Sequence, residues 1–142
     1  MHKAILVIDS SVIIKWLSSD REENLDYADN ILADAQNGRV ELITPELAKY
    51  EVGNVLLFSK NLSPGQVKIV LVKFYNLPLS FINESEELAK ETFELAFNLK
   101  ITYYDASFLS LARQYDATLV TENMKHQGKL SDIKVVLLSK YK

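Results

Sequence analysis

The order of apolar and polar positions along the chain predicts alternating strands and helices. Short apolar runs of the kind found in buried strands are interleaved with longer segments whose apolar residues recur every three or four positions. The expected strands cover residues 4–8, 41–44, 79–82, 117–121 and 134–138. The expected helices cover residues 10–16, 21–36, 45–60, 63–75, 84–98 and 102–114. Such alternation implies right-handed crossovers and a mainly parallel sheet flanked by helices, which is the α/β class.

Residues that favour helix ends support several of these boundaries. Ser10 or Ser11 can cap the first helix, because a serine hydroxyl accepts a hydrogen bond from a backbone N–H of the first turn. Asn37-Gly38 follows the second helix, where a left-handed residue commonly ends a helix. Pro45 is expected in the first turn of the third helix, where its missing N–H costs nothing.

Length and composition indicate one globular domain with a single core. The chain has 142 residues, of which 48% are hydrophobic and 25% charged. It has no cysteine, which excludes disulfides and thiolate metal sites and fits a reducing cytosol. No apolar run approaches the roughly 18 to 20 residues of a membrane span, and no signal-peptide pattern precedes the first strand. We therefore expect a cytoplasmic protein without membrane contact.

Four segments carry an acidic residue, or its amide, where this fold would bring them together. Asp9 follows the first expected strand and Glu122-Asn123 follows the fourth, whereas Glu51 and Asp105 lie on expected helices. Ligands of open parallel sheets bind outside the carboxyl ends of the strands. Clustered carboxylates are costly unless a positive charge lies between them, and a divalent metal ion commonly supplies it. The sequence therefore predicts a metal-dependent enzyme, with a nuclease as the leading interpretation.

The position of Glu51 on its helix supports this hypothesis. Leu47 and Val55 lie one turn away on either side, which places Glu51 at the edge of the apolar stripe. Asn54 follows three residues later and could orient the carboxylate. An ordinary surface glutamate is the alternative.

Asp105 and Asp9 each have a structural alternative to metal binding. Asp105 lies one helical turn before Phe108, which places it at the border of the buried face of its helix. Alternatively, Thr102 could be the N-cap of this helix, with Asp105 as the acidic partner of the cap. Capping and metal binding remain open for Asp105. Asp9 could likewise cap the first helix, although the serines that follow it already supply caps. For Glu122-Asn123, a plain turn is the alternative.

The net charge of −3 argues against nucleic-acid binding at first sight, because phosphate binding usually requires a basic surface. Metal ions held by the acids would supply positive charge where a scissile phosphate lies, and lysines could line a path to it. Solubilising surface lysines are the simpler interpretation. The net charge therefore weakens the nuclease hypothesis only in part.

Four segments that span nearly the whole chain resemble the motifs of PIN-domain ribonucleases, specifically the VapC toxins of toxin–antitoxin pairs. Residues 7–16 (VIDSSVIIKW) resemble the opening strand with the first acid, Asp9. Residues 45–56 (PELAKYEVGNVL) resemble the helix of the second acid. Residues 104–112 (YDASFLSLA) are the most specific match and contain the third acid. Residues 119–125 (LVTENMK) resemble the Thr-x-Asp segment at a strand end.

The resemblance implies a single PIN domain over residues 1–142, with three α/β/α layers. It also implies a toxin that hydrolyses RNA phosphodiesters with Mg²⁺ or Mn²⁺, forms a homodimer, and is neutralised by an antitoxin whose C-terminal segment covers the cleft. Asp9 and Asp105 would ligate the ion directly, and Glu51 would complete the shell directly or through water. Thr121 and the serines after Asp9 would position waters.

One position departs from the family pattern. Asn123 stands where the family commonly has an aspartate, so a neutral amide replaces the fourth acid. An amide oxygen can ligate a hard cation but brings no charge, which should weaken a second metal site. Glu122 lies beside it, and the sequence leaves open whether Glu122 substitutes. We therefore expect one tightly held ion and a second, if any, that arrives with the substrate. The main alternative is a PIN-like RNA- or protein-binding module with weakened catalysis.

Phosphotransfer domains, which also place an aspartate after a strand, fit less well. A dehalogenase-like site needs a second aspartate two residues after the first, where this chain has Ser11. A receiver-like site needs an acidic pair after the first strand, and Asp9 stands alone there.

Two groups of apolar or aromatic residues suggest contacts with RNA or with partners. Tyr103 and Tyr104 precede the third acid and could stack on bases, although packing beneath the helix is expected for at least one of them. Residues 56–58 and 67–74 carry apolar side chains that could form a helical pair for a dimer or an antitoxin. A core role for this pair is the equal alternative.

Overall fold

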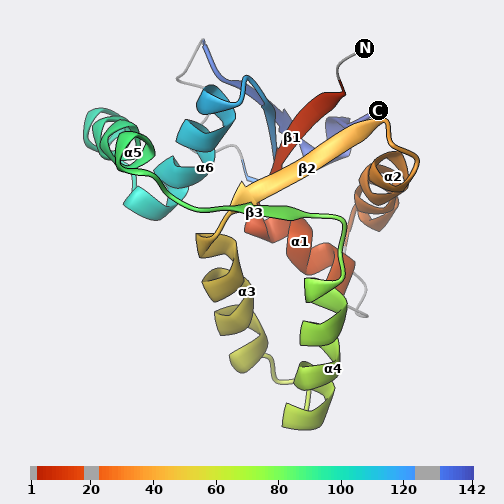
Figure 1. The fold of residues 1–142 in the computed structure, drawn as a ribbon. Helices are drawn as coiled ribbons and strands as arrows, with labels where there is room; N and C mark the ends of the chain where they lie inside the picture. The colour runs from red at the N-terminus through yellow and green to blue at the C-terminus, as the bar shows by residue number, and fades with distance from the viewer. Residues whose placement is uncertain (1–2, 18–22, 124–131) are drawn as a thin grey trace.

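The computed structural model describes residues 3–17, 23–123 and 132–142. Five strands in these ranges form one sheet in the order β3-β2-β1-β4-β5, and all four neighbouring pairs are parallel (Figure 1). The strands are β1 Ala4–Ile8, β2 Val40–Pro45, β3 Ser80–Ile82, β4 Thr118–Thr121 and β5 Lys134–Leu137. The parallel sheet confirms the fold class that the apolar pattern predicts.

The helices are α1 Ser10–Leu17, α2 Leu25–Gln36, α3 Leu47–Leu57, α4 Pro64–Tyr75, α5 Glu86–Leu99 and α6 Tyr103–Gln114, and a short 3₁₀ helix, η2 Leu138–Lys140, follows β5. Figure 1 shows α5 and α6 on one side of the sheet and α2 on the other, where it packs against α1. This arrangement confirms the three α/β/α layers. Helices α3 and α4 run away from the sheet as a pair at the bottom of the view. None of the described helices is long and apolar enough to cross a bilayer.

The end of β2 corrects one predicted boundary. Pro45 is the last residue of β2 and lies opposite Ile82 of β3, so it does not belong to the first turn of α3. The N–H of Glu46 then donates to the carbonyl of Ile82 over 3.1 Å, which extends the ladder past the proline. A proline is tolerated at a strand end because only its own N–H is missing. Helix α3 ends at Leu57, three residues before the predicted end.

The first residue of α2 also differs from the prediction. The helix begins at Leu25, after Asn24 adopts a left-handed conformation with φ of 65°. Residues 21 and 22 of the predicted helix lie outside the described ranges. At the other end, Gly38 has φ of 74°, which confirms the left-handed residue expected there.

The buried strands at the centre of the sheet fix the positions of the residues that follow them. Val7 and Ile8 of β1 and Val120 of β4 are fully buried, as expected for strands covered on both faces. The buried hydroxyl of Thr44 in β2 donates to the carbonyl of Ile8 over 2.8 Å. The N–H of Asp9 donates to the carbonyl of Val120 over 3.0 Å. The chain is therefore held from both sides where β1 ends and the first acid begins.

Candidate active site

Asp9 lies at the carboxyl end of β1, directly before α1. Its carbonyl accepts from the N–H groups of Val12 and Ile13 over 3.0 and 3.2 Å, and its carboxylate accepts from the N–H of Ser11 over 3.2 Å. Asp9 therefore caps α1, and the prediction that a serine is the cap was wrong. The strand hydrogen bond of Asp9 holds it outside the helix, whereas Ser10 and Ser11 already lie in the first turn.

The carboxylate of Asp9 is half-buried and held by hydroxyl groups. Burial raises its pKa, hydrogen bonds from Ser11 and Thr121 lower it, and the charge of Asp105 raises it further. The hydroxyl of Ser11 makes a short hydrogen bond to the same carboxylate oxygen that accepts from its N–H. Asp9 can therefore cap α1 and belong to a charged site at the same time.

Glu51 projects from α3 toward the start of α1. The hydroxyl of Ser10 donates to its carboxylate over 2.7 Å. Burial raises the pKa of Glu51, the hydrogen bond from Ser10 lowers it, and the charges of Asp9 and Asp105 raise it. Glu51 is therefore not an ordinary surface glutamate, because it lies within electrostatic reach of both other acids.

Asp105 lies in the first turn of α6. Its N–H donates to the hydroxyl of Thr102 over 3.0 Å, so Thr102 is the N-cap that the sequence suggests. Asp105 is exposed, and its charge raises the pKa of both Asp9 and Glu51. The three carboxylates of Asp9, Glu51 and Asp105, here called the acid cluster, therefore come from three elements that meet near the end of β1.

The segment after β4 divides into a part near Asp9 and a part that faces α1 and α2. Thr121 is buried, and its hydroxyl hydrogen-bonds to Asp9 and accepts from the N–H of Asn123 over 3.1 Å. Glu122 instead pairs with Lys15 of α1, with 3.5 Å between Nζ and Oε2, and accepts from Asn24 over 3.3 Å. Thr121 and the backbone of Asn123 thus lie next to the first acid, as the sequence predicts.

The chemistry of the acid cluster fits a hard divalent cation. Carboxylate oxygens are the ligands that Mg²⁺ and Mn²⁺ prefer, and the like charges of the cluster disfavour one another without a cation. Among the described residues, no three Asp, Glu, His or Cys side chains already converge as metal ligands would. Ser10 and Ser11 each hold one carboxylate, of Glu51 and Asp9 respectively. The carboxylate donors of the acid cluster fit the predicted ion.

Lys15 and Asn24 contribute to the site although sequence reasoning did not single them out. Lys15 is only 6% exposed and lies on α1 between Ile14 and Trp16. Lys15 could have been recognised from the sequence, because it lies within an apolar helical segment, where a buried charge needs a partner of opposite charge. Asn24 gave no such signal, because its position depends on the left-handed turn before α2. Trp16 is buried in the core, and its indole N–H donates to the carbonyl of Ala28 over 2.7 Å.

The tyrosines before Asp105 differ in their surroundings. Tyr103 donates from its hydroxyl to Glu84, and its burial together with this bond raises its pKa to about 12. Tyr104 is 59% exposed. Tyr103 is 38% exposed, so Tyr104 is the more accessible of the two to a ligand.

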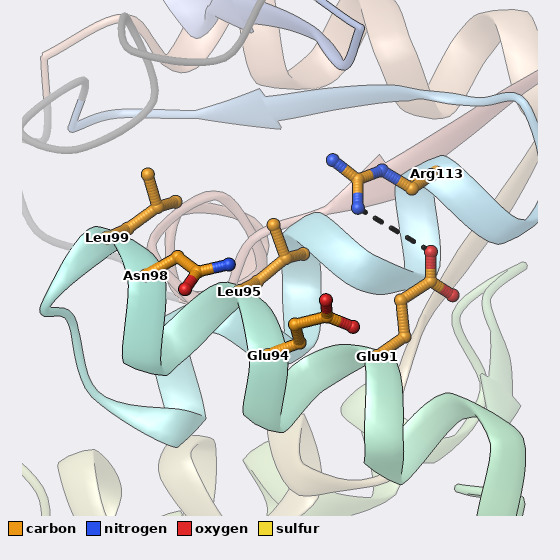
Figure 2. A pocket seen from close by; sticks show the side chains of 6 residues that line it. All are labelled: Glu91, Glu94, Leu95, Asn98, Leu99 and Arg113. Carbon is orange, nitrogen blue, oxygen red and sulfur yellow. Dashed lines mark ion pairs between the residues drawn. The ribbon is translucent and has the colours of Figure 1, made fainter.

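A hollow of about 260 Å³ lies between α5 and α6, away from the acid cluster. Figure 2 shows the six side chains that line it, which are Glu91, Glu94, Leu95, Asn98, Leu99 and Arg113. Arg113 pairs with Glu91 over 3.6 Å and with Asp132 over 2.9 Å. The cation of this hollow, Arg113, is paired with carboxylates, so the hollow does not resemble a catalytic site.

Comparisons of the structure with solved structures find the same fold in toxin–antitoxin complexes. VapBC2 of Rickettsia felis, solved with a fragment of promoter DNA, has a TM-score of 0.74 and 20% identity, covering 94% of this chain and 98% of that chain. VapBC-1 of nontypeable Haemophilus influenzae has a TM-score of 0.66 and 18% identity, covering 96% and 99%. VapC20 of Mycobacterium tuberculosis, described as a toxin that cleaves the sarcin–ricin loop, has a TM-score of 0.65 and 8% identity, covering 87% and 93%.

Comparisons of the sequence identify the family. A search of curated proteins finds no significant match. The family model of the PIN domain matches residues 6–129, which is most of the chain and includes all four acidic segments. The chain therefore belongs to the PIN domain family.

Proposed function

We propose that this chain is a metal-dependent endoribonuclease that hydrolyses RNA phosphodiesters with Mg²⁺ or Mn²⁺. The observation that carries the proposal is the electrostatic contact among Asp9, Glu51 and Asp105, which come from three separate elements. Structural ion-pair networks also shift pKa values, but a network of that kind contains cations, whereas the charges that shift this cluster are carboxylates. Family membership and the VapC-like neighbours support the same activity.

The residues of the site have complementary roles in the proposed reaction. Asp9 and Asp105 would hold the ion directly, and Glu51 would contribute directly or through water. Thr121 orients Asp9, and Asn123 can offer a neutral amide oxygen. When bound, the ion lowers the pKa of a coordinated water and stabilises the charge that develops on the phosphate. Ser10 and Ser11 hold the carboxylates of Glu51 and Asp9 in position, and their hydroxyls could orient waters at the site.

We further propose that the protein is the toxin of a toxin–antitoxin pair, a single PIN domain that acts in the cytoplasm and forms a homodimer. The similar structures from R. felis and H. influenzae are complexes of a toxin with its antitoxin, which supports an antitoxin as the partner. Large apolar side chains that are exposed on or next to α3 and α4 give such a partner a surface. They are Tyr50, Val55, Leu57, Phe58, Ile69, Val72 and Tyr75.

The helical pair α3–α4 has a buried part and an exposed part, which supports a core role together with the proposed partner surface. Leu56 and Phe74 are buried in the core, whereas Leu57 and Phe58 are each 72% exposed. Val67 is partly buried against the core. One part of the pair therefore stabilises the fold, and the other part is available for a protein partner.

Cleavage of a mixed RNA pool by antitoxin-free protein tests the proposed activity. Reactions with Mg²⁺, with Mn²⁺ and with EDTA are compared for the parent, for Asp9→Asn and for Asp29→Asn, a matched control on the exposed face of α2. We expect cleavage that needs the metal, persists in Asp29→Asn and falls by about 100-fold or more in Asp9→Asn. Equal cleavage by parent and Asp9→Asn would show a contaminating ribonuclease or a wrong site.

A binding module with weakened catalysis is the second candidate, and it is favoured by the neutral Asn123 at the fourth acidic position. Such a module would bind RNA or a protein without cutting RNA under any metal condition. Asn123→Asp separates the two candidates, because it restores the fourth charge. A large gain of cleavage in that variant from an inactive parent would support the binding module.

A further inference from the structure

The carboxylate of Glu122 is held outside the acid cluster by two side chains. Its Oε2 lies 3.5 Å from Nζ of Lys15, and its Oε1 accepts from the side-chain amide of Asn24 over 3.3 Å. Lys15 belongs to α1 and Asn24 stands directly before α2. Both carboxylate oxygens of Glu122 therefore have partners on the side of the molecule formed by α1 and α2.

The ion pair of Lys15 and Glu122 is shielded from solvent, so each charge depends on the other for stabilisation. The side chain of Lys15 is 5% exposed and that of Glu122 is 27% exposed. An ammonium group this deeply buried is stable only next to negative charge, and removal of one member leaves the other charge poorly solvated. Lys15 and Glu122 thus neutralise each other beside the site.

The backbone of Glu122 connects this pair to the first acid. Its N–H donates to the hydroxyl of Ser11 over 3.3 Å, and the same hydroxyl hydrogen-bonds to the carboxylate of Asp9. Thr121, the preceding residue, also hydrogen-bonds to Asp9. A shift of Glu122 would therefore move Ser11 and Thr121, which both hydrogen-bond to the carboxylate of Asp9.

We propose that Lys15 is a positioning residue of the metal site, because it binds Glu122 on the α1–α2 side and prevents this carboxylate from ligating the ion. The inference rests on the proposed metal-dependent function. Glu122 therefore does not replace the fourth acid, and among the described residues the acid cluster supplies the charged ligands of the site.

Mn²⁺ binding without RNA tests this assignment, with calorimetry giving affinity and stoichiometry. The variants are Glu122→Gln, Lys15→Met and the double variant Lys15→Met/Glu122→Gln, with Asp9→Asn as the reference for a lost ligand. Lys15→Met keeps an unbranched side chain as far as the ε position and removes the ammonium group, and the double variant replaces the whole pair by neutral groups. Melting temperatures in EDTA are measured in parallel to detect loss of folding.

The charge balance around the ion determines the expected results. Glu122→Gln should weaken Mn²⁺ binding by less than about tenfold, because only a distant charge is lost, and the double variant should recover the affinity of the parent. Lys15→Met should bind Mn²⁺ more tightly than the parent and melt at a lower temperature, because the released carboxylate adds negative charge near the ion. A ligand function of Glu122 predicts the opposite pattern, in which the double variant remains as weak as Asp9→Asn.

Two results would overturn the proposal. One is a double variant that binds Mn²⁺ as weakly as Asp9→Asn, and the other is a Lys15→Met variant that matches the parent in both affinity and melting temperature. If Lys15→Met does not fold, Glu122→Gln and the double variant still decide between the two assignments. Failure of the metal site itself gives a different result, since the parent would then bind no more Mn²⁺ than Asp9→Asn does.

Discussion

Asp9 caps α1 and also belongs to the acid cluster, so its hydrogen bonds favour the fold while its charge opposes it. Burial and the charge of Asp105 raise its pKa, and Ser11 and Thr121 only partly offset this. An asparagine at the same position can still cap the helix, because it retains a side-chain oxygen acceptor. The two contributions of Asp9 can therefore be separated by removing its charge alone.

We predict that Asp9→Asn melts at a higher temperature than the parent in EDTA at pH 7, by roughly 2–4 °C if the gain is about 1 kcal/mol. The raised pKa means that native Asp9 takes up its proton at a higher pH than unfolded Asp9 does. The folded parent therefore gains stability as the pH falls from above this raised pKa toward 3.8, and the advantage of the variant shrinks over the same range. Thermal unfolding at a series of pH values measures this difference. A less stable variant at pH 7 would contradict it, and Asp29→Asn controls for a general effect of charge removal.

At the scale of elements, the periodicity of apolar residues was sufficient to find the strands and helices, because burial on one or both faces determines that pattern. The bounds of β1 agree with the prediction, those of α4 differ from it by one residue, and the parallel sheet follows from the alternation. Pro45 was misassigned because a proline fits both the end of a strand and the first turn of a helix. The choice between the two depended on β3, which pairs with β2 and lies far away in the sequence.

The candidate site was predictable to the extent that its residues follow strands or border apolar stripes. Asp9, Glu51 and Asp105 were found in this way, and the charges of Asp9 and Asp105, which raise the pKa of Glu51, are consistent with that choice. The pairing of Lys15 with Glu122 was not predictable, because it joins residues from α1 and from the end of β4. A side-chain contact of this kind leaves no periodic signal in the sequence.

The N-terminus of α6 carries Asp105, so its cap should affect both stability and the site. We predict that Thr102→Ala costs about 1 kcal/mol of unfolding free energy and lowers RNA cleavage, whereas Thr102→Ser retains both. The matched control is Ser63→Ala, which removes the N-cap hydrogen bond of α4 to the N–H of Gln66. It should cost a similar free energy without loss of cleavage, because α4 carries no residue of the acid cluster. Equal losses of cleavage in both alanine variants would show that Asp105 depends on overall stability alone.

For the whole molecule, the proposed ion and the net charge of −3 are linked through folding stability. The acid cluster forms only in the folded chain, because its three members lie on separate elements. An ion that binds this cluster and not the unfolded chain stabilises the fold by an amount that grows with the logarithm of its concentration. At about 100 times the dissociation constant, the gain is about 2.7 kcal/mol, which corresponds to several degrees in melting temperature for a chain of this size.

We therefore predict that Mn²⁺ or Mg²⁺ raises the melting temperature of the parent in a saturable manner and that EDTA reverses the shift. Asp9→Asn should start from a higher melting temperature in EDTA yet gain much less from the ion, so the two curves should cross as the metal concentration rises. A shift of the same size in both proteins would indicate ion binding elsewhere on the acidic surface. Curves that cross would mean that the same carboxylate destabilises the empty fold and binds the ion. That result requires no RNA substrate, so it tests the metal site independently of the cleavage assay.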